Sequence, residues 1–149
     1  MKTTHGAAAT ATAIPGDPLE AEEAAASVTE RACRTASLRD RLEQQVLRIA
    51  GVRRNGSGPR GPKHANLHVA GVDGESLLIA LDASGVEVSA GSACSAGSLE
   101  PSHVLMAMGL GRDAAQSSVR FSLAPSLDSE TIDVAAERVR DVIGRLRAV

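Results

Sequence analysis

The chain has 149 residues, of which 43% are hydrophobic and 1% aromatic, and its 16 basic and 18 acidic residues give a formal net charge of −2. This length fits one domain with a core of aliphatic side chains. The single Phe, the lack of Tyr and Trp and the balanced charge argue against stacking of nucleic-acid bases and against a basic surface for a phosphate backbone.

The cysteine count and the hydropathy exclude further classes. Cys33 and Cys94 are too few for a disulfide framework, and neither has a second cysteine at metal-ligand spacing. No apolar run approaches the roughly 18 residues of a membrane span, and Met1–Ala13 lacks the apolar core of a secretion signal. We therefore expect a cytoplasmic protein with no metal site, and neither nucleic acid nor a membrane as a partner.

The chain begins with an Ala/Thr-rich stretch, residues 1–16, which we expect to be a disordered tail before a folded domain at 17–149. Asp17 and Pro18 are typical of a helix start, and Gly51 is a natural stop. The intervening residues predict one long helix, or two with a break near Thr35–Ser37. Strands are then expected at 52–55, 65–70, 86–89 and 118–123, and helices at 74–83, 102–108 and 129–147. This order predicts an α/β (α+β) fold, a two-layer sandwich with helices on one face of a small sheet and a long N-terminal helix.

Cys94 lies in Ser89–Ser98, where all nine remaining residues are Ser, Ala or Gly. Such a stretch has little bulk, and its glycines allow backbone freedom, so the thiol could reach a target. The same residues also suit a tight turn around a buried, unreactive cysteine. Composition alone leaves both interpretations of Cys94 open. Cys33 lies between Ala32 and Arg34 on a predicted helix, and we expect it to have no chemical role.

Arg120 is the second candidate, because it alternates with Val119 and Phe121 in a predicted strand and so faces the opposite side. Arginine binds a carboxylate through two parallel hydrogen bonds, although a solvated strand residue has the same pattern. His64, His68 and His103 show no metal-site spacing with Cys94.

The run SAGSACSAGSLEPSHVL at Ser89–Leu105 resembles the cysteine desulfurases of iron–sulfur cluster assembly, which are pyridoxal-phosphate enzymes of the class V aminotransferase fold. The similarity extends to GVDGESLL at Gly71–Leu78 and SVRFSL at Ser118–Leu123, and covers about residues 36–147. It implies that Cys94 attacks the sulfur of pyridoxal-bound L-cysteine, giving L-alanine and a persulfide for iron–sulfur cluster or thio-cofactor assembly. It also implies that Arg120 holds the substrate carboxylate.

The chain departs from the family pattern at Ala90, Lys63 and His68, where Ser, Asn and a less polar residue are usual. More importantly, the Schiff-base lysine, the phosphate cup, the ring-stacking His and the ring-nitrogen Asp of the family have no counterpart here. The chain therefore resembles only the small C-terminal domain, and we expect it to be inactive alone.

Three hypotheses follow. The chain is part of a desulfurase that needs a cofactor domain or a full-length desulfurase as partner, or a persulfide relay that takes sulfur from another desulfurase, or a scaffold-binding module without chemistry. The expected partners also include a sulfur acceptor or iron–sulfur scaffold protein, and a second copy of this chain as a homodimer.

Overall fold

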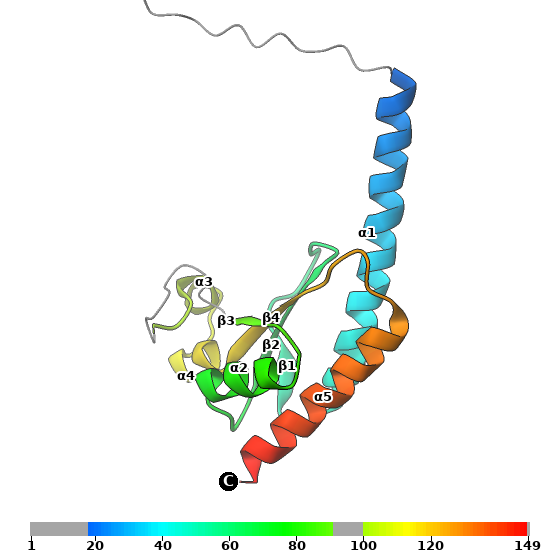
Figure 1. Ribbon diagram of the computed structural model, residues 1–149. Helices are drawn as coiled ribbons and strands as arrows, with labels where there is room; N and C mark the ends of the chain where they lie inside the picture. Colours follow the sequence, from blue (N-terminus) through cyan, green and yellow to red (C-terminus); the bar gives the residue numbers. More distant parts are fainter. Residues whose placement is uncertain (1–17, 91–99, 149) are drawn as a thin grey trace, which may run out of the picture.

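The computed structural model describes residues 18–90 and 100–148, with side chains from residue 27 onward (Figure 1). Its elements are α1 (Pro18–Val46), β1 (Val52–Arg54), β2 (His64–Val69), α2 (Gly74–Ala83), β3 (Ser89–Ala90), α3 (His103–Ala107), α4 (Arg112–Gln116), β4 (Ser118–Ser122) and α5 (Ser129–Arg147). No helix in this part of the chain is both long and apolar enough to cross a bilayer.

The four strands form one antiparallel sheet in the order β1-β2-β4-β3. β2 lies between β1 and β4, so two strands far apart in the sequence become neighbours at the centre of the sheet. Residues 65, 67 and 69 of β2 and residues 119 and 121 of β4 point to the same, buried side, as the period of two requires.

Helices α1, α2 and α5 cover this buried face, and α1 packs along α5 (Figure 1). Each helix contributes one apolar stripe to a common core. The helical members are Leu38, Leu42 and Val46 of α1, Leu77 and Leu81 of α2, and Ile132, Ala136, Val139, Val142 and Ile143 of α5. The predicted two-layer arrangement, with helices on one face of a small sheet and a long N-terminal helix, is therefore confirmed.

Local capping explains why two of these helices begin where they do. The Asp73 carboxylate accepts a hydrogen bond from the backbone N–H of Ser76 at 2.8 Å, and Asp128 accepts one from Thr131 at 2.8 Å. Each carboxylate satisfies one of the N–H groups that the first turn of a helix leaves unpaired. The predicted bounds of α2 and α5 are those observed.

The main differences from the predicted elements are the end of the first helix, the position of one strand and one helix that was not predicted. The first helix is continuous and ends at Val46, and the chain then turns through residues 47–51 to Gly51, whose φ is +75°. The strand expected at 86–89 is confined to Ser89–Ala90. Helix α4 was not predicted, because its N-cap is Gly111, which offers no side-chain hydrogen bond. The tail expected at residues 1–16 lies outside the described residues.

Candidate functional site

Arg120 stands in the middle of the sheet face that the three long helices leave uncovered. Its Cα pairs with that of Asn66 on β2 and with that of Ser89 on β3, so the three residues form one row across the sheet. Its strand neighbours Val119 and Phe121 are buried in the core, as the alternation predicted. We call the uncovered side the polar face and define it by Asn55, His64, Asn66, His68, Ser89, Ser118, Arg120 and Ser122.

The guanidinium of Arg120 has one nitrogen, Nε, without an acceptor in the described part of the chain. Its Nε is buried, and among the described residues no group accepts a hydrogen bond from it. No carboxylate in this part of the chain forms an ion pair with Arg120. Burying a polar group without a partner costs free energy, and the cost is larger for a charged group. A ligand that supplies an anionic acceptor would remove this cost.

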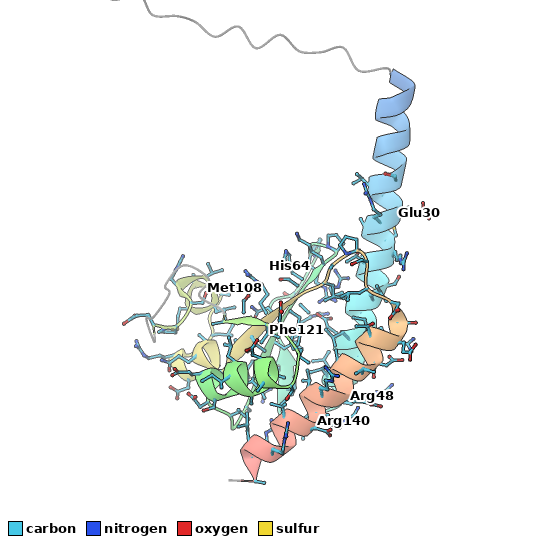
Figure 2. All side chains as sticks on the ribbon, viewed as in Figure 1. Glu30, Arg48, His64, Met108, Phe121 and Arg140 are labelled. Carbon is cyan, nitrogen blue, oxygen red and sulfur yellow. The ribbon has the colours of Figure 1, made fainter. Side chains whose placement is uncertain are left out.

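His64 extends the polar face along β2 (Figure 2). Its Nδ1 lies 3.0 Å from the hydroxyl oxygen of Ser122, its partner in the pairing of β2 with β4. Burial lowers the pKa of His64, and the positive charges of Lys63 and Arg120 lower it further. The lowered pKa favours the neutral ring, which offers hydrogen-bonding capacity without charge.

A chain of hydrogen bonds crosses the polar face beside Arg120. The amide nitrogen Nδ2 of Asn55 donates to Oδ1 of Asn66 at 2.7 Å and to the hydroxyl of Ser118 at 2.8 Å. The Ser118 hydroxyl in turn donates to the carbonyl of Ala114 at 2.6 Å. No sequence motif singles out Asn55 or Asn66, although the alternation of β2 places Asn66 between His64 and His68 on one side.

The structure brings the other predicted residues to different places. Cys94 lies outside the described residues, within the segment 91–99 that follows β3. His68 faces Ser117, with Nδ1 3.2 Å from its hydroxyl oxygen, and His103 is exposed at the start of α3. Cys33 is exposed on α1. In the described part of the chain, no three His, Cys, Asp or Glu side chains are grouped to hold a metal ion.

The arrangement suits recognition of a small anion. The described residues around Arg120 offer one guanidinium, neutral amides, hydroxyls and an imidazole, but no opposing carboxylate. Two surface hollows occur elsewhere, one along the end of α5 and one between α1 and α5, and Arg120 lines neither.

Comparison with known proteins identifies the family of this chain. A family model described as aminotransferase class-V matches residues 6–134. The cysteine desulfurase IscS of Aeromonas salmonicida is 47% identical over 112 residues, which are 74% of this chain and 27% of that protein. The cysteine desulfurase IscS 1 of Archaeoglobus fulgidus is 38% identical over 138 residues, 92% of this chain and 36% of that protein.

A solved structure has the same fold. A NifS-like protein from Rickettsia africae superposes with a TM-score of 0.68 at 24% identity, covering 78% of this chain and 30% of that chain. This chain thus spans much less than half the length of the relatives it matches. It belongs to the class-V aminotransferase family and corresponds to part of a cysteine desulfurase.

Proposed function

We propose that this chain is the carboxylate-binding and sulfur-accepting part of a cysteine desulfurase. The observation that carries the proposal is the half-buried guanidinium of Arg120 on the polar face, whose buried Nε has no acceptor among the described residues. The α-carboxylate of L-cysteine matches this group in charge and in its two acceptor oxygens.

Cys94 is the proposed sulfur acceptor. Its thiolate forms an S–S bond with the sulfur of L-cysteine while the C–S bond of the substrate breaks. The electron pair of that bond stays on the substrate carbon, which takes up a proton and becomes the methyl group of L-alanine. Cys94 follows Ser89, the β3 partner of Arg120, by five residues, which span at most about 17 Å when extended. The proposed thiol is therefore tethered within reach of a substrate at Arg120.

Breaking the C–S bond in this way requires an electron sink, which pyridoxal phosphate supplies in this class of enzyme. The described residues do not fit that cofactor. Lys63, the one lysine among them, is exposed before β2, and the groups around Arg120 form no phosphate cradle. We therefore propose that the cofactor is held by a separate cofactor domain or a full-length desulfurase that covers the polar face.

The remaining partners follow from the chemistry. A persulfide on Cys94 needs an acceptor, and we propose a sulfur-accepting or iron–sulfur scaffold protein in the cytoplasm. The alternative is a relay that takes sulfur from another desulfurase. It requires the thiol of Cys94 but does not require Arg120 to bind a substrate carboxylate.

The first experiment uses the isolated chain. With L-cysteine and added pyridoxal phosphate we expect no alanine and no sulfide, because the described residues supply no electron sink. Chromatographic assay of alanine and colorimetric assay of sulfide check this expectation. Turnover by the pure chain would show that it carries a cofactor site of its own.

The second experiment adds the A. salmonicida desulfurase from which the segment matched by this chain has been removed. We call this shortened protein the cofactor-bearing body. We expect alanine formation and one added sulfur atom on Cys94 by mass spectrometry. Cys94→Ala should abolish the persulfide, whereas Cys33→Ala, the matched change at the other cysteine, should leave it intact.

Arg120 separates the proposal from the relay. Arg120→Gln should raise KM for L-cysteine at least tenfold, because one charge-assisted hydrogen bond is worth about 1.5–3 kcal/mol. The relay is tested with the intact desulfurase as sulfur donor. If Arg120→Gln leaves KM unchanged while Cys94 still gains sulfur from the intact enzyme, the relay is correct and the proposed function is not.

A further inference from the structure

The side-chain amide of Asn66 lies beside Arg120 and is a second hydrogen-bond donor. Neighbouring side chains determine how this amide is oriented. Asn66 is the direct partner of Arg120 in the pairing of β2 with β4, and both side chains are half-buried on the polar face. Directly opposite residues of an antiparallel pair have Cβ atoms about 4.5–5.5 Å apart. One small ligand therefore spans both side chains.

The hydrogen bonds determine which way the amide of Asn66 points. The single hydroxyl proton of Ser118 goes to the carbonyl of Ala114 at 2.6 Å, so the Ser118 oxygen accepts from Asn55. The Asn55 group that faces Ser118 is consequently Nδ2, and its other proton goes to Oδ1 of Asn66 at 2.7 Å. This leaves Nδ2 of Asn66 as the end of the amide turned away from Asn55.

Nδ2 of Asn66 makes no hydrogen bond with any described residue, and neither does Nε of Arg120. Two neighbouring donors without acceptors match the two oxygens of one carboxylate. The backbone holds the arrangement, because the N–H of Asn55 donates to the carbonyl of Asn66 at 2.9 Å.

We propose that Asn66 donates the second hydrogen bond to the amino-acid carboxylate held by Arg120, and that Asn55 is a positioning residue that orients the Asn66 amide. This inference rests on the proposed function of Arg120. Asn66 of β2 then takes part in substrate recognition, and Asn55, the first residue after β1, orients the Asn66 amide.

The test observes the side chains themselves in the 149-residue chain. In a ¹⁵N-labelled sample we follow the Arg120 Nε–H and the Asn66 Nδ2 signals during titration with L-alanine, with L-alaninamide at equal ionic strength as the ligand that lacks a carboxylate. Both signals should shift with L-alanine along one binding curve, and neither with L-alaninamide.

The outcomes separate the two proposals. A response of Arg120 with a silent Asn66 overturns the present inference and leaves the role of Arg120 standing. No response of either signal overturns both, and equal responses to L-alaninamide show that the carboxylate is not what is recognised.

Variants test the two asparagines in turn. Asn66→Leu keeps the volume and removes the donor, and should weaken L-alanine binding about tenfold. Asn55→Leu should weaken it as well while the backbone spectrum stays that of the folded chain. Arg53→Gln, which removes an exposed charge opposite His68, should leave the affinity unchanged. Wild-type affinity in Asn55→Leu would overturn the positioning role.

Discussion

At the scale of single residues, the charged side chains of Arg120 and Asp133 differ in their hydrogen bonding. The buried Nε of Arg120 has no acceptor among the residues that the structure describes, whereas both oxygens of the Asp133 carboxylate accept hydrogen bonds. Arg41 donates to its two oxygens at 2.7 Å each, and Gln45 donates to Oδ1 at 2.7 Å. The Asp133 pair links α5 to α1, which indicates that it serves the fold, whereas the unpaired Arg120 is available for a ligand.

The hydrogen bonds from Arg41 and Gln45 lower the pKa of Asp133 from its ordinary value of 3.8 to about 2. The folded-state pKa lies below the unfolded value, so the contribution to stability is present in full above 3.8 and is lost as the pH falls through about 2. We expect the wild type to lose more stability than Asp133→Asn across this window. Urea unfolding followed by circular dichroism at several pH values measures it.

The control for this measurement lies on the same helix. Asp141→Asn removes an exposed carboxylate of α5 that forms no ion pair with a described residue, and it serves as the matched variant. A pH dependence of Asp133→Asn identical to the wild type would contradict the assignment.

At the scale of elements, glycines on helices show how closely α2 approaches α4. A Cβ built on Gly74 overlaps the backbone carbonyl of Gln116, whereas one built on Gly144 of α5 meets nothing within 4 Å. Gly74 is buried and Gly144 is exposed. The first glycine is therefore required by packing, and the second is not.

Gly74→Ala should lower the free energy of unfolding by about 2 kcal/mol, because the added methyl group meets backbone that cannot move aside cheaply. The matched change Gly144→Ala should raise it by about 0.5–1 kcal/mol, since Ala favours a helix over Gly. Chemical denaturation of both variants measures the pair. An unchanged free energy of unfolding in Gly74→Ala would show that α2 and α4 are separated more widely than described.

A cluster of charges fixes the loop between β1 and β2 to α1. Glu43 of α1 is 3% exposed and is paired with Arg60 of the loop, with Arg54 of β1 at 3.9 Å. Arg39 donates to the carbonyl of Gly61 at 2.6 Å. The hydrogen bond to Glu43 raises the pKa of Arg60, which is what an interacting pair requires.

Glu43→Gln should destabilise the fold by about 1–3 kcal/mol, because Arg60 loses a charged acceptor. Arg60→Gln should cost a similar amount, and the double variant should cost less than the sum of the two. A double-mutant cycle by urea denaturation measures the coupling, with Arg53→Gln as the exposed control. Additive effects would show that the two side chains do not interact.

At the scale of the whole molecule, α1 extends beyond the body that it helps to form (Figure 1). Glu30 lies on the projecting part (Figure 2). Leu42 of the same helix packs in the core. From residue 27 to residue 34 every side chain is exposed except the half-buried Ala32, and the first buried one is Thr35. A helix segment without tertiary packing is marginally stable in water.

Amide hydrogen exchange should therefore be much faster at residues 27–34 than at residues 38–46 of the same helix. Mass spectrometry of peptides from the two segments measures the difference in the isolated chain. Adding the cofactor-bearing body tests whether the projecting part is covered there, since its exchange should then slow. Equal protection of both segments in the isolated chain would contradict the packing described.

The local pattern of the sequence was sufficient for much of the fold. The period of two at 118–123 predicted that Arg120 faces away from Val119 and Phe121, and capping at Asp73 placed the start of α2. These features depend on residues a few positions apart, where backbone geometry alone decides the outcome. The motif around Cys94 carried the family resemblance in the same local way, while the role of Cys94 stays a prediction.

Only the tertiary structure decided what surrounds Arg120. Asn66 and Ser89 become its neighbours through strand register, which depends on pairing between segments tens of residues apart. The direction of the Asn66 amide depends on Asn55 and Ser118, which no sequence period connects. Sequence alone therefore determined which face Arg120 occupies. Packing determined that no described residue accepts a hydrogen bond from its Nε and that the Asn66 amide lies beside it.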